Sequence, residues 1–205
     1  MSNAVSNARI VRPGAATTDS GQKFVREVVE TVLLTLLIFF AVHFSVQPFR
    51  VDGPSMQPGL HTGEYVVVNL LTYDFTAPQR GDVIVFHPPD SPDTPYVKRI
   101  VAIPGDTVSV TADAIYVNDV KLKEPYISAM APGQNENSSV LPPFKLDKDQ
   151  YFVLGDNRIN SQDSRFFSRP VTRQMIVGKA ELVIWPVTSL QWIRNYSSVF
   201  AGIKR

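Results

Sequence analysis

Two residues in this chain could act as a nucleophile and its base. Ser55 lies within residues 51–59, where two glycines and two prolines impose an irregular backbone that can expose a side chain. On a predicted strand, Lys98 shares a face with Tyr96, Ile100 and Ala102. Burial on that apolar face would lower the pKa of the amine, and a neutral amine can remove a proton from a serine hydroxyl. Taken singly, a solvated turn serine and an edge-strand lysine explain these residues better than catalysis does.

Histidine is the most frequent partner of a nucleophilic serine, and the chain contains His43, His61 and His87. His61 follows Ser55 by six residues, and His87 precedes two prolines at a predicted strand end. Neither spacing requires contact with Ser55, so a solvated or structural role explains both histidines better, and they remain the alternative bases. His43 lies in an apolar run, where helix packing explains it.

A third polar segment, residues 155–165, follows a predicted strand and contains two aspartates and two arginines. Asp163 and Arg165 could pair and brace this loop against the core. Arg158 stands where a calcium-binding loop needs an oxygen ligand, so a calcium site is not expected.

Composition excludes several classes of protein. The 205 residues include 20 Lys and Arg against 19 Asp and Glu, which argues against a nucleic-acid partner held by bulk charge. The absence of cysteine excludes disulfide scaffolds, thiolate metal sites and cysteine nucleophiles. Three histidines leave little material for a metal site, so we expect no metal and no other cofactor.

An uncharged run of nineteen residues, Thr31–Phe49, approaches the length of about 20 that a helix needs to cross a bilayer. A secretory signal peptide has a shorter apolar core and a small-x-small cleavage site, which does not follow here. A buried soluble helix would show a polar face. We therefore expect a mobile cytoplasmic tail over residues 1–27 and a transmembrane helix over residues 28–49.

The flanking charges predict the orientation of this helix. Four basic residues precede the run: Arg9, Arg12, Lys23 and Arg26. After it, Arg50 is the only basic residue before Arg80. The positive-inside rule thus predicts a single-pass protein of the cell membrane, with a cytoplasmic N-terminus and residues 50–205 on the extracytoplasmic side. The lipid bilayer is accordingly an expected partner.

Residues 50–205 are expected to form a mainly β domain. β-Branched and aromatic runs recur between turn signals, at Tyr65–Val68, Asp82–Phe86, Tyr96–Ile103, Thr107–Val110, Ala114–Val117, Tyr151–Leu154 and Met175–Trp185. Asn118 and Asp119 predict a tight hairpin, and residues 128–148 an inserted loop. The predicted architecture is a coiled mixed or antiparallel β-sheet, barrel-like, behind one N-terminal transmembrane helix.

Four segments, in order, resemble the boxes of the bacterial type I signal peptidases (leader peptidases) of the Ser–Lys class and single-span type. The nucleophile box matches Ser55-Met56-x-Pro58, and the following core strand matches residues 80–86. The general-base box matches residues 98–106, and the last box matches residues 155–165. The resemblance covers Phe49 to about Trp185, and four boxes in order behind an N-terminal span are highly specific.

The resemblance implies a membrane-anchored serine endopeptidase that removes signal peptides from exported precursor proteins. Ser55 would attack the scissile carbonyl, and Lys98 would act as general base and later protonate the leaving amine. Ser161 would hydrogen-bond and orient the Lys98 amine. Asp163 and Arg165 would hold the last box in place.

The resemblance also assigns supporting residues, and the substrate-binding residues are inferred from strand addition beside Phe49–Gly53 and Tyr96–Lys98. Met56 would pack beneath the nucleophile. Gly53 stands where some relatives carry an oxyanion-binding hydroxyl, so backbone N–H groups would bind the oxyanion here. A precursor would bind as an added β-strand. Its small residues at −1 and −3, counted back from the cleavage site, would enter pockets. The candidate pocket residues are Phe49, Val51, Tyr96 and Val97.

Two other hypotheses compete with a peptidase that acts on other proteins. A self-cleaving Ser–Lys repressor is disfavoured by the predicted span and by the lack of a DNA-binding helical segment. A membrane-anchored, non-catalytic β domain that binds an extracytoplasmic partner has no reason to contain both Ser55 and Lys98. A precursor-cleavage assay separates the three.

Overall fold

The computed structural model describes residues 18–112, 114–127 and 140–204, so residues 1–17 of the expected tail and 128–139 of the expected loop lie outside it. The chain divides into two compact units, residues 1–43 and 44–205. Each unit is described by itself below.

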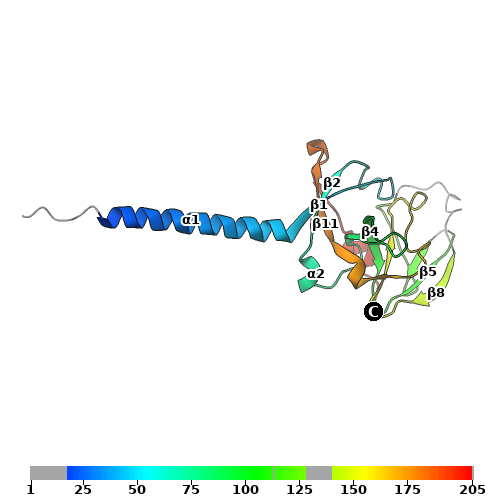
Figure 1. The fold of residues 1–205 in the computed structure, drawn as a ribbon. Coiled ribbons are helices and arrows are strands. Elements are labelled where there is room, and N and C mark those ends of the chain that lie inside the picture. The colour runs from blue at the N-terminus through cyan, green and yellow to red at the C-terminus, as the bar shows by residue number, and fades with distance from the viewer. Residues whose placement is uncertain (1–17, 113, 128–139, 205) are drawn as a thin grey trace, which may run out of the picture. The chain divides into compact units, whose positions relative to one another are not determined.

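The long helix α1 (Thr18–Ser45) contributes the described residues of the first unit (Figure 1). Its part from Gly21 to Ser45 is long and apolar enough to cross a membrane, by length and composition. The helix begins at Thr18 rather than at residue 28, and an ion pair between Arg26 and Glu30, one turn apart, fits a helical start in this polar stretch.

The predicted helix end at Phe49 is wrong. Helix α1 ends at Ser45, and the next five residues form strand β1 (Val46–Arg50), which pairs antiparallel with β2 (Tyr65–Asn69). Proline has no backbone N–H and disfavours helical geometry in the residue before it. Pro48 therefore prevents the helix from continuing, although Val46–Phe49 is as uncharged as the helical residues Thr31–Ser45 before it.

The second unit consists of short strands, turns and single-turn helices, which confirms the expected mainly β fold. After β1 and β2 follow α2 (Thr72–Phe75), β3 (Val83–Phe86), β4 (Tyr96–Ala102), β5 (Thr107–Val110), β6 (Ile115–Val117), β7 (Val120–Lys121) and β8 (Leu141–Lys145). Then come β9 (Gln150–Leu154), β10 (Val171–Thr172), η1 (Arg173–Met175), β11 (Ile176–Trp185), η2 (Val187–Ser189), β12 (Gln191–Trp192) and η3 (Ser197–Phe200).

These strands form two sheets. The larger sheet has the order β1-β2-β11-β3-β4-β9-β10, with β12 paired to β11, and the smaller has the order β7-β6-β5-β8. Every strand pair among the described residues is antiparallel. Of the two sheet types expected from the sequence, mixed or antiparallel, the structure therefore has the antiparallel one. The long strand β11 shifts register between Ala180 and Leu182 and again between Val183 and Trp185. Such bulges bend a strand and curl its sheet.

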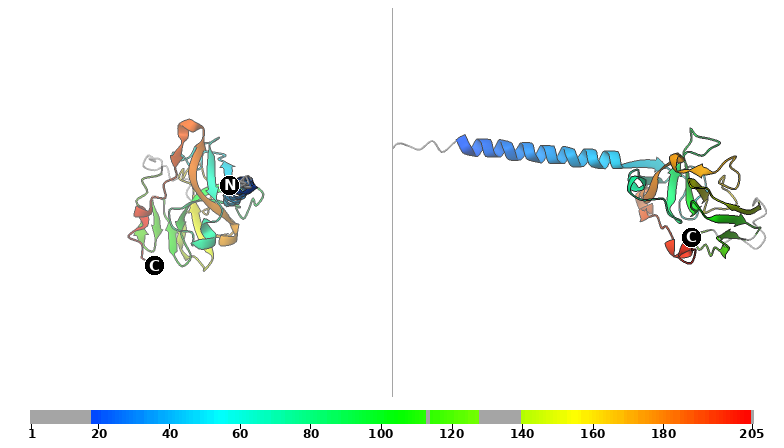
Figure 2. Two further views of the ribbon diagram at one scale, coloured as in Figure 1. Left: turned by 90° about the vertical axis from the view of Figure 1, so that its left-hand side faces the viewer. Right: turned by 90° about the horizontal axis from the view of Figure 1, so that it is seen from below.

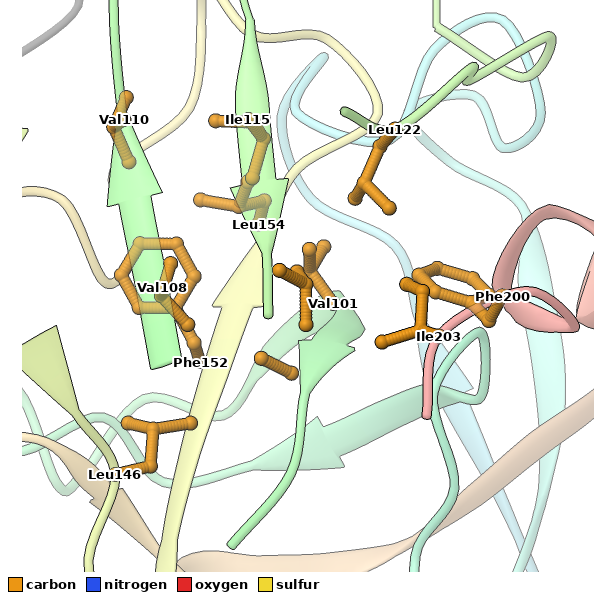
Figure 3. Close-up of a cluster of buried hydrophobic side chains, with 12 residues drawn as sticks. Val101, Val108, Val110, Ile115, Leu122, Leu146, Phe152, Leu154, Phe200 and Ile203 are labelled. Atoms are coloured by element: carbon orange, nitrogen blue, oxygen red, sulfur yellow. The ribbon is translucent and has the colours of Figure 1, made fainter. Parts of the chain in front are cut away.

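An apolar cluster fills the space between the two sheets (Figure 3). Its labelled members come from the smaller sheet (Val108, Val110 and Ile115), the larger sheet (Val101, Phe152 and Leu154), the residues just after β7 and β8 (Leu122 and Leu146) and the C-terminal segment (Phe200 and Ile203). Burying one such side chain contributes about 1.5–3 kcal/mol. The cluster therefore fixes how the two sheets meet, and with them the strands that carry the candidate site.

The predicted hairpin at Asn118 and Asp119 is confirmed. Both residues have positive φ, 49° and 64°, and Val117 pairs with Val120 across the turn. Positive φ at both central residues is the geometry of a two-residue β-hairpin.

The predicted loop over residues 128–148 is wrong in its described second half. Strand β8, with the sequence Leu-Pro-Pro-Phe-Lys, pairs with β5 there. Proline in a strand is tolerated at a sheet edge, where the missing N–H has no partner to lose. Strand β8 is such an edge, so its prolines indicated a loop while the chain forms a strand.

The C-terminal segment, red in Figure 2, is tied to the rest of the β domain by long-range hydrogen bonds. Asn118 Nδ2 donates to the carbonyl of Lys204 (2.8 Å), and Arg80 donates to the carbonyl of Ile203 (3.3 Å). Gly81, with φ +92°, lies so close to Asn195 that a Cβ would overlap the Asn195 carbonyl oxygen. A glycine is therefore required where this segment crosses the start of β3.

Gly81→Ala should destabilise the domain more than Gly63→Ala does. Both glycines have φ +92°, but a Cβ at Gly63 meets nothing within 4 Å. The two variants share a backbone strain of about 1–2 kcal/mol. Gly81→Ala should lose about 1–3 kcal/mol more, because a backbone carbonyl must move. Urea unfolding in detergent measures both losses, and equal losses would contradict the close approach.

Candidate active site

Ser55 lies in the connection between β1 and β2, held by short turns on both sides. The N–H of Gln57 donates to the carbonyl of Pro54 (3.1 Å), and that of Leu60 donates to the carbonyl of Met56 (2.9 Å). Met56 is 1% exposed and packs in an apolar cluster with Leu60. Ser55 itself is only partly buried. The residue after Ser55 thus anchors the connection while the serine remains accessible.

Lys98 contacts Ser55 directly. Its side chain extends from β4 and is 3% exposed. The amine donates to Ser55 Oγ at 2.8 Å and to the carbonyl oxygen of Val97 at 3.0 Å, and it lies 5.1 Å from the ring centre of Tyr96. Two residues 43 positions apart are thereby brought into hydrogen-bond contact.

Burial lowers the pKa of the Lys98 amine to about 8, because the charged form is poorly solvated there. The carboxylates of Asp163 and Asp156 act in the opposite direction and raise it. Each carboxylate is paired with a buried arginine, Asp163 with Arg165 at 2.8 Å and Asp156 with Arg99 at 2.7 Å. A useful fraction of the amine is therefore neutral near neutral pH and able to accept the proton of Ser55.

Neither histidine considered as an alternative base contacts Ser55. His61 lies beside Glu64, with 3.8 Å between His61 Nδ1 and Glu64 Oε1, and His87 contacts the carbonyl of Pro92. His43, on α1, stacks on Phe39. Within residues 18–112, 114–127 and 140–204, no cluster of three or more His, Cys, Asp or Glu side chains could hold a metal ion.

The segment from Gly155 to Arg165 lies directly against the Ser55 backbone. The N–H of Asn157 donates to the carbonyl of Ser55 at 2.9 Å. A Cβ at Gly155 would lie 2.5 Å from that carbonyl oxygen and would overlap Ser161 Oγ. Only glycine fits at this point, where the two segments meet.

Asp163 and Arg165 tie this segment together. Asp163, 0% exposed, accepts hydrogen bonds from the N–H of Gly155 (3.1 Å) and from the Arg165 guanidinium (2.8 and 2.9 Å). Arg165 also donates to the carbonyl of Arg158 at 2.8 Å. These contacts connect the two ends of the segment through one buried ion pair.

Ser161 differs from expectation, since no hydrogen bond joins it to Lys98. Its hydroxyl is buried and has no hydrogen-bond partner in the described part of the chain. It lies beside Gly155 instead. The hydrogen bonds that orient the Lys98 amine go to Ser55 Oγ and the Val97 carbonyl.

Arg99 is a buried residue whose role the sequence analysis missed. Its guanidinium pairs with both oxygens of Asp156 (2.9 and 2.7 Å) and donates to the carbonyls of Gly81 (2.8 Å) and Arg194 (2.9 Å). It also lies over the ring of Tyr126, 4.4 Å from its centre. A charged residue inside an otherwise apolar strand was the available signal, because such a residue needs a buried partner.

A second buried ion pair, between Glu124 and Arg158, was also missed. The Arg158 guanidinium donates to both carboxylate oxygens (2.9 and 2.6 Å), and its Nε donates to the carbonyl of Gly155 (3.0 Å). Each side chain is 5% exposed. Since 34 residues separate the partners, no local spacing could have revealed the pair.

Two strand edges near Ser55 are unpaired among the described residues. Strand β4 pairs with β3 through Tyr96–Arg99 but with β9 only from Arg99 onward, so Tyr96–Lys98 has one open side. Strand β1 pairs with β2 alone. Of the expected pocket residues, Phe49, Tyr96 and Val97 are partly buried. Val51, at 3% exposure, belongs to the core and offers little surface.

Comparison with known proteins gives consistent matches. Residues 25–185 match the family model described as "Signal peptidase, peptidase S26". The chain is 36% identical over 174 residues to signal peptidase I S of Bacillus subtilis (82% of this chain, 91% of the relative). It is 34% identical over 185 residues to signal peptidase IB of Staphylococcus aureus (82% and 93%). A crystal structure of a signal peptidase I from Enterococcus faecalis aligns with a TM-score of 0.44 at 32% identity, over 51% of this chain and 97% of that one.

The Lys98 amine should titrate with a midpoint near pH 8, well below that of an exposed lysine, because burial disfavours its charged form. NMR of lysine labelled at the ε-carbon, with Lys98→Arg to assign the signal, measures the midpoint. Free lysine, with a pKa of about 10.4, is the reference. A Lys98 midpoint equal to that of free lysine would contradict the buried amine.

Proposed function

Because the chain belongs to the signal peptidase family, peptidase S26, we propose that it is a membrane-anchored serine endopeptidase that removes signal peptides with Ser55 as nucleophile and Lys98 as general base. One observation carries the mechanism: a buried amine with a lowered pKa lies 2.8 Å from a partly exposed serine hydroxyl. No second base contacts that hydroxyl among the described residues.

In the proposed acylation step, Ser55 Oγ attacks the scissile carbonyl carbon while neutral Lys98 accepts the hydroxyl proton. The tetrahedral intermediate collapses, the C–N bond breaks, and Lys98 gives its proton to the leaving amine. Water then attacks the acyl-enzyme with Lys98 again as base, and the signal peptide leaves as a carboxylate. Lys98 thus acts alternately as base and acid, and its protonation state is the same at the end of the cycle as at the start.

The oxyanion in these steps would be bound by backbone N–H groups. Gly53 has no hydroxyl to contribute, and its φ of +84° shapes the chain just before Ser55. The N–H of Ser55 is the natural first donor, because it belongs to the residue that forms the covalent bond.

The precursor would bind as an added strand along the open sides of Phe49–Gly53 and Tyr96–Lys98. Alternate side chains of a strand point to the same face, so the residues at −1 and −3 would point together into the apolar cluster that contains Met56. Phe49 and Val97 pack against that cluster and retain exposed surface. Their proximity would favour small residues at −1 and −3.

Helix α1 would provide the membrane anchor. Its stretch Gly21–Ser45 has the required length and apolar composition. By the positive-inside rule, the basic residues before it support a cytoplasmic N-terminus and an extracytoplasmic β domain. Secretory precursors are delivered to that side, where their cleavage sites emerge from the bilayer.

The wild-type protein in detergent should cleave a precursor bearing an Ala-x-Ala site after the −1 residue, as mapped by mass spectrometry. Ser55→Ala and Lys98→Ala should each lower kcat by more than about a thousandfold, because they remove the nucleophile or its base. Lys148→Ala, which removes an exposed lysine, serves as the matched control.

Near-normal cleavage by folded Lys98→Ala would overturn the Ser–Lys mechanism and reopen His61 and His87 as bases. A folded wild-type protein that leaves every precursor intact would instead favour the non-catalytic binding domain.

Val97→Ala should broaden substrate choice at the proposed pocket. With the wild-type enzyme, replacing a −3 alanine by leucine should lower kcat/KM sharply. In Val97→Ala, the leucine precursor should recover about tenfold, because the pocket gains the volume of two methyl groups. The same substitution of buried Val51 should lower stability instead, since it leaves a cavity in the core. Unchanged discrimination in Val97→Ala would remove Val97 from the pocket.

A further inference from the structure

Asn157 makes hydrogen bonds to both peptide groups that flank Ser55. Its side-chain Nδ2 donates to the carbonyl of Pro54 at 3.1 Å, and its backbone N–H donates to the carbonyl of Ser55 at 2.9 Å. The other side-chain atom, Oδ1, accepts from the N–H of Asn160 at 3.4 Å. That contact turns the amide so that Nδ2 points at Pro54.

The first of these hydrogen bonds fixes the direction of the Ser55 N–H. The Pro54–Ser55 peptide is trans, so its C=O and N–H point in opposite directions within one plane. The Pro54 carbonyl accepts two hydrogen bonds, from the N–H of Gln57 and from Asn157 Nδ2, both at 3.1 Å. With its oxygen held at two points, the peptide cannot rotate without breaking one of them.

The N–H on the opposite side of this peptide has no use within the fold. Among the described residues, none accepts a hydrogen bond from the Ser55 N–H. A backbone donor that is held in place and left unsatisfied beside a nucleophile is suited to bind negative charge that develops there.

We propose that Asn157 is a positioning residue that aims the Ser55 N–H at the oxyanion of the tetrahedral intermediate. This inference rests on the proposed Ser–Lys hydrolysis, and it adds the side chain that fixes the direction of the oxyanion-binding N–H. Asn157 touches neither substrate nor base. It acts through the Pro54–Ser55 peptide.

The turn that carries Asn157 is itself rigid before any substrate binds. Arg158 Nε donates to the carbonyl of Gly155 at 3.0 Å, and the Arg158 guanidinium is paired with Glu124. Asp163 accepts from the N–H of Gly155. Because these bonds are formed in the free protein, no reorganisation is needed when charge appears on the substrate.

A purely structural role predicts a different outcome from a positioning role. Asn157 is only partly buried, and a side-chain hydrogen bond at such a position contributes modestly to folding. Loss of Nδ2 should therefore leave the fold intact and release one peptide plane. Its effect should appear in the transition state and not in substrate binding.

The experiment compares wild type, Asn157→Ala and Asn157→Leu as full chains in detergent, with a precursor as substrate. Both variants keep the backbone N–H that holds the Ser55 carbonyl, and neither side chain can donate to Pro54. We expect kcat to fall about tenfold to a hundredfold, less than for outright removal of an oxyanion donor, with KM within about twofold. Gln162→Ala, which removes an exposed amide from the same segment, should match wild type.

Two further measurements separate positioning from general loosening. A peptide boronic acid, whose boron bonds to Ser55 Oγ and mimics the tetrahedral intermediate, should lose affinity by the same factor as kcat. A non-cleavable peptide of the same sequence should keep its Kd. In Asn157→Ala, the rising limb of the pH–rate profile should keep its midpoint near 8 while the plateau falls.

Wild-type kcat and boronate affinity in Asn157→Ala would overturn the positioning role and leave the proposed function standing. A shifted pH midpoint with a lowered Tm would also overturn it, since the loop as a whole would then have moved. If Asn157→Ala does not fold, the nearly isosteric and uncharged Asn157→Leu decides the question by the same criteria. A folded wild type that neither cleaves precursors nor binds the boronate would overturn the proposed function and this inference together.

Discussion

The contact between the Lys98 amine and the Ser55 hydroxyl depends on one condition, which is that water is excluded from the surroundings of the amine. An ammonium loses its proton near neutral pH only where water cannot solvate the charge. Lys98 meets that condition by extending from a strand that is buried along most of its length. Every other charged group nearby must then be neutralised, because one unpaired carboxylate would restore the proton that burial removes.

The need to keep the Lys98 amine uncharged explains why the two carboxylates near it are paired with buried arginines. Asp163 and Asp156 both raise the pKa of Lys98, and each is bound by an arginine that is itself almost fully buried. The ion pairs therefore hold the loop by hydrogen bonding and limit the field of the two carboxylates at the amine. Removing one arginine would disturb the loop and the proton affinity of the base together.

The parts of the structure that sequence predicted are those with a local cause. The hairpin at Asn118 and the strands around Lys98 follow from turn chemistry and period-two patterning. Strand β1 was missed because Val46–Phe49 is as uncharged as the helical residues Thr31–Ser45 before it, and β8 because its prolines indicate a loop. Both are strands only because a distant partner pairs with them.

In the candidate site, too, some features could be predicted from local sequence and others depend on distant contacts. Motif order brought Ser55 and Lys98 together before any geometry was available, whereas the Asp156–Arg99 and Glu124–Arg158 pairs depend on contacts across 57 and 34 residues. The hydrogen bond expected between Ser161 and Lys98 is absent from the described residues, and the Ser161 hydroxyl lies beside Gly155. Residue type predicts which side chains can interact, and packing decides which of them do.

The contacts of the candidate site join residues far apart in the sequence. These separations determine at what stage of folding the site forms. Lys98 reaches Ser55 across 43 residues, Arg99 reaches Arg194 across 95, and Asn157 reaches Pro54 across 103. Contacts of such high order close slowly, and together, because loop entropy is lost before they contribute. Until they close, Lys98 is in water and carries its proton, since a solvated lysine has a pKa of about 10.4. In the proposed mechanism, a newly made chain would therefore stay inactive until these contacts have closed.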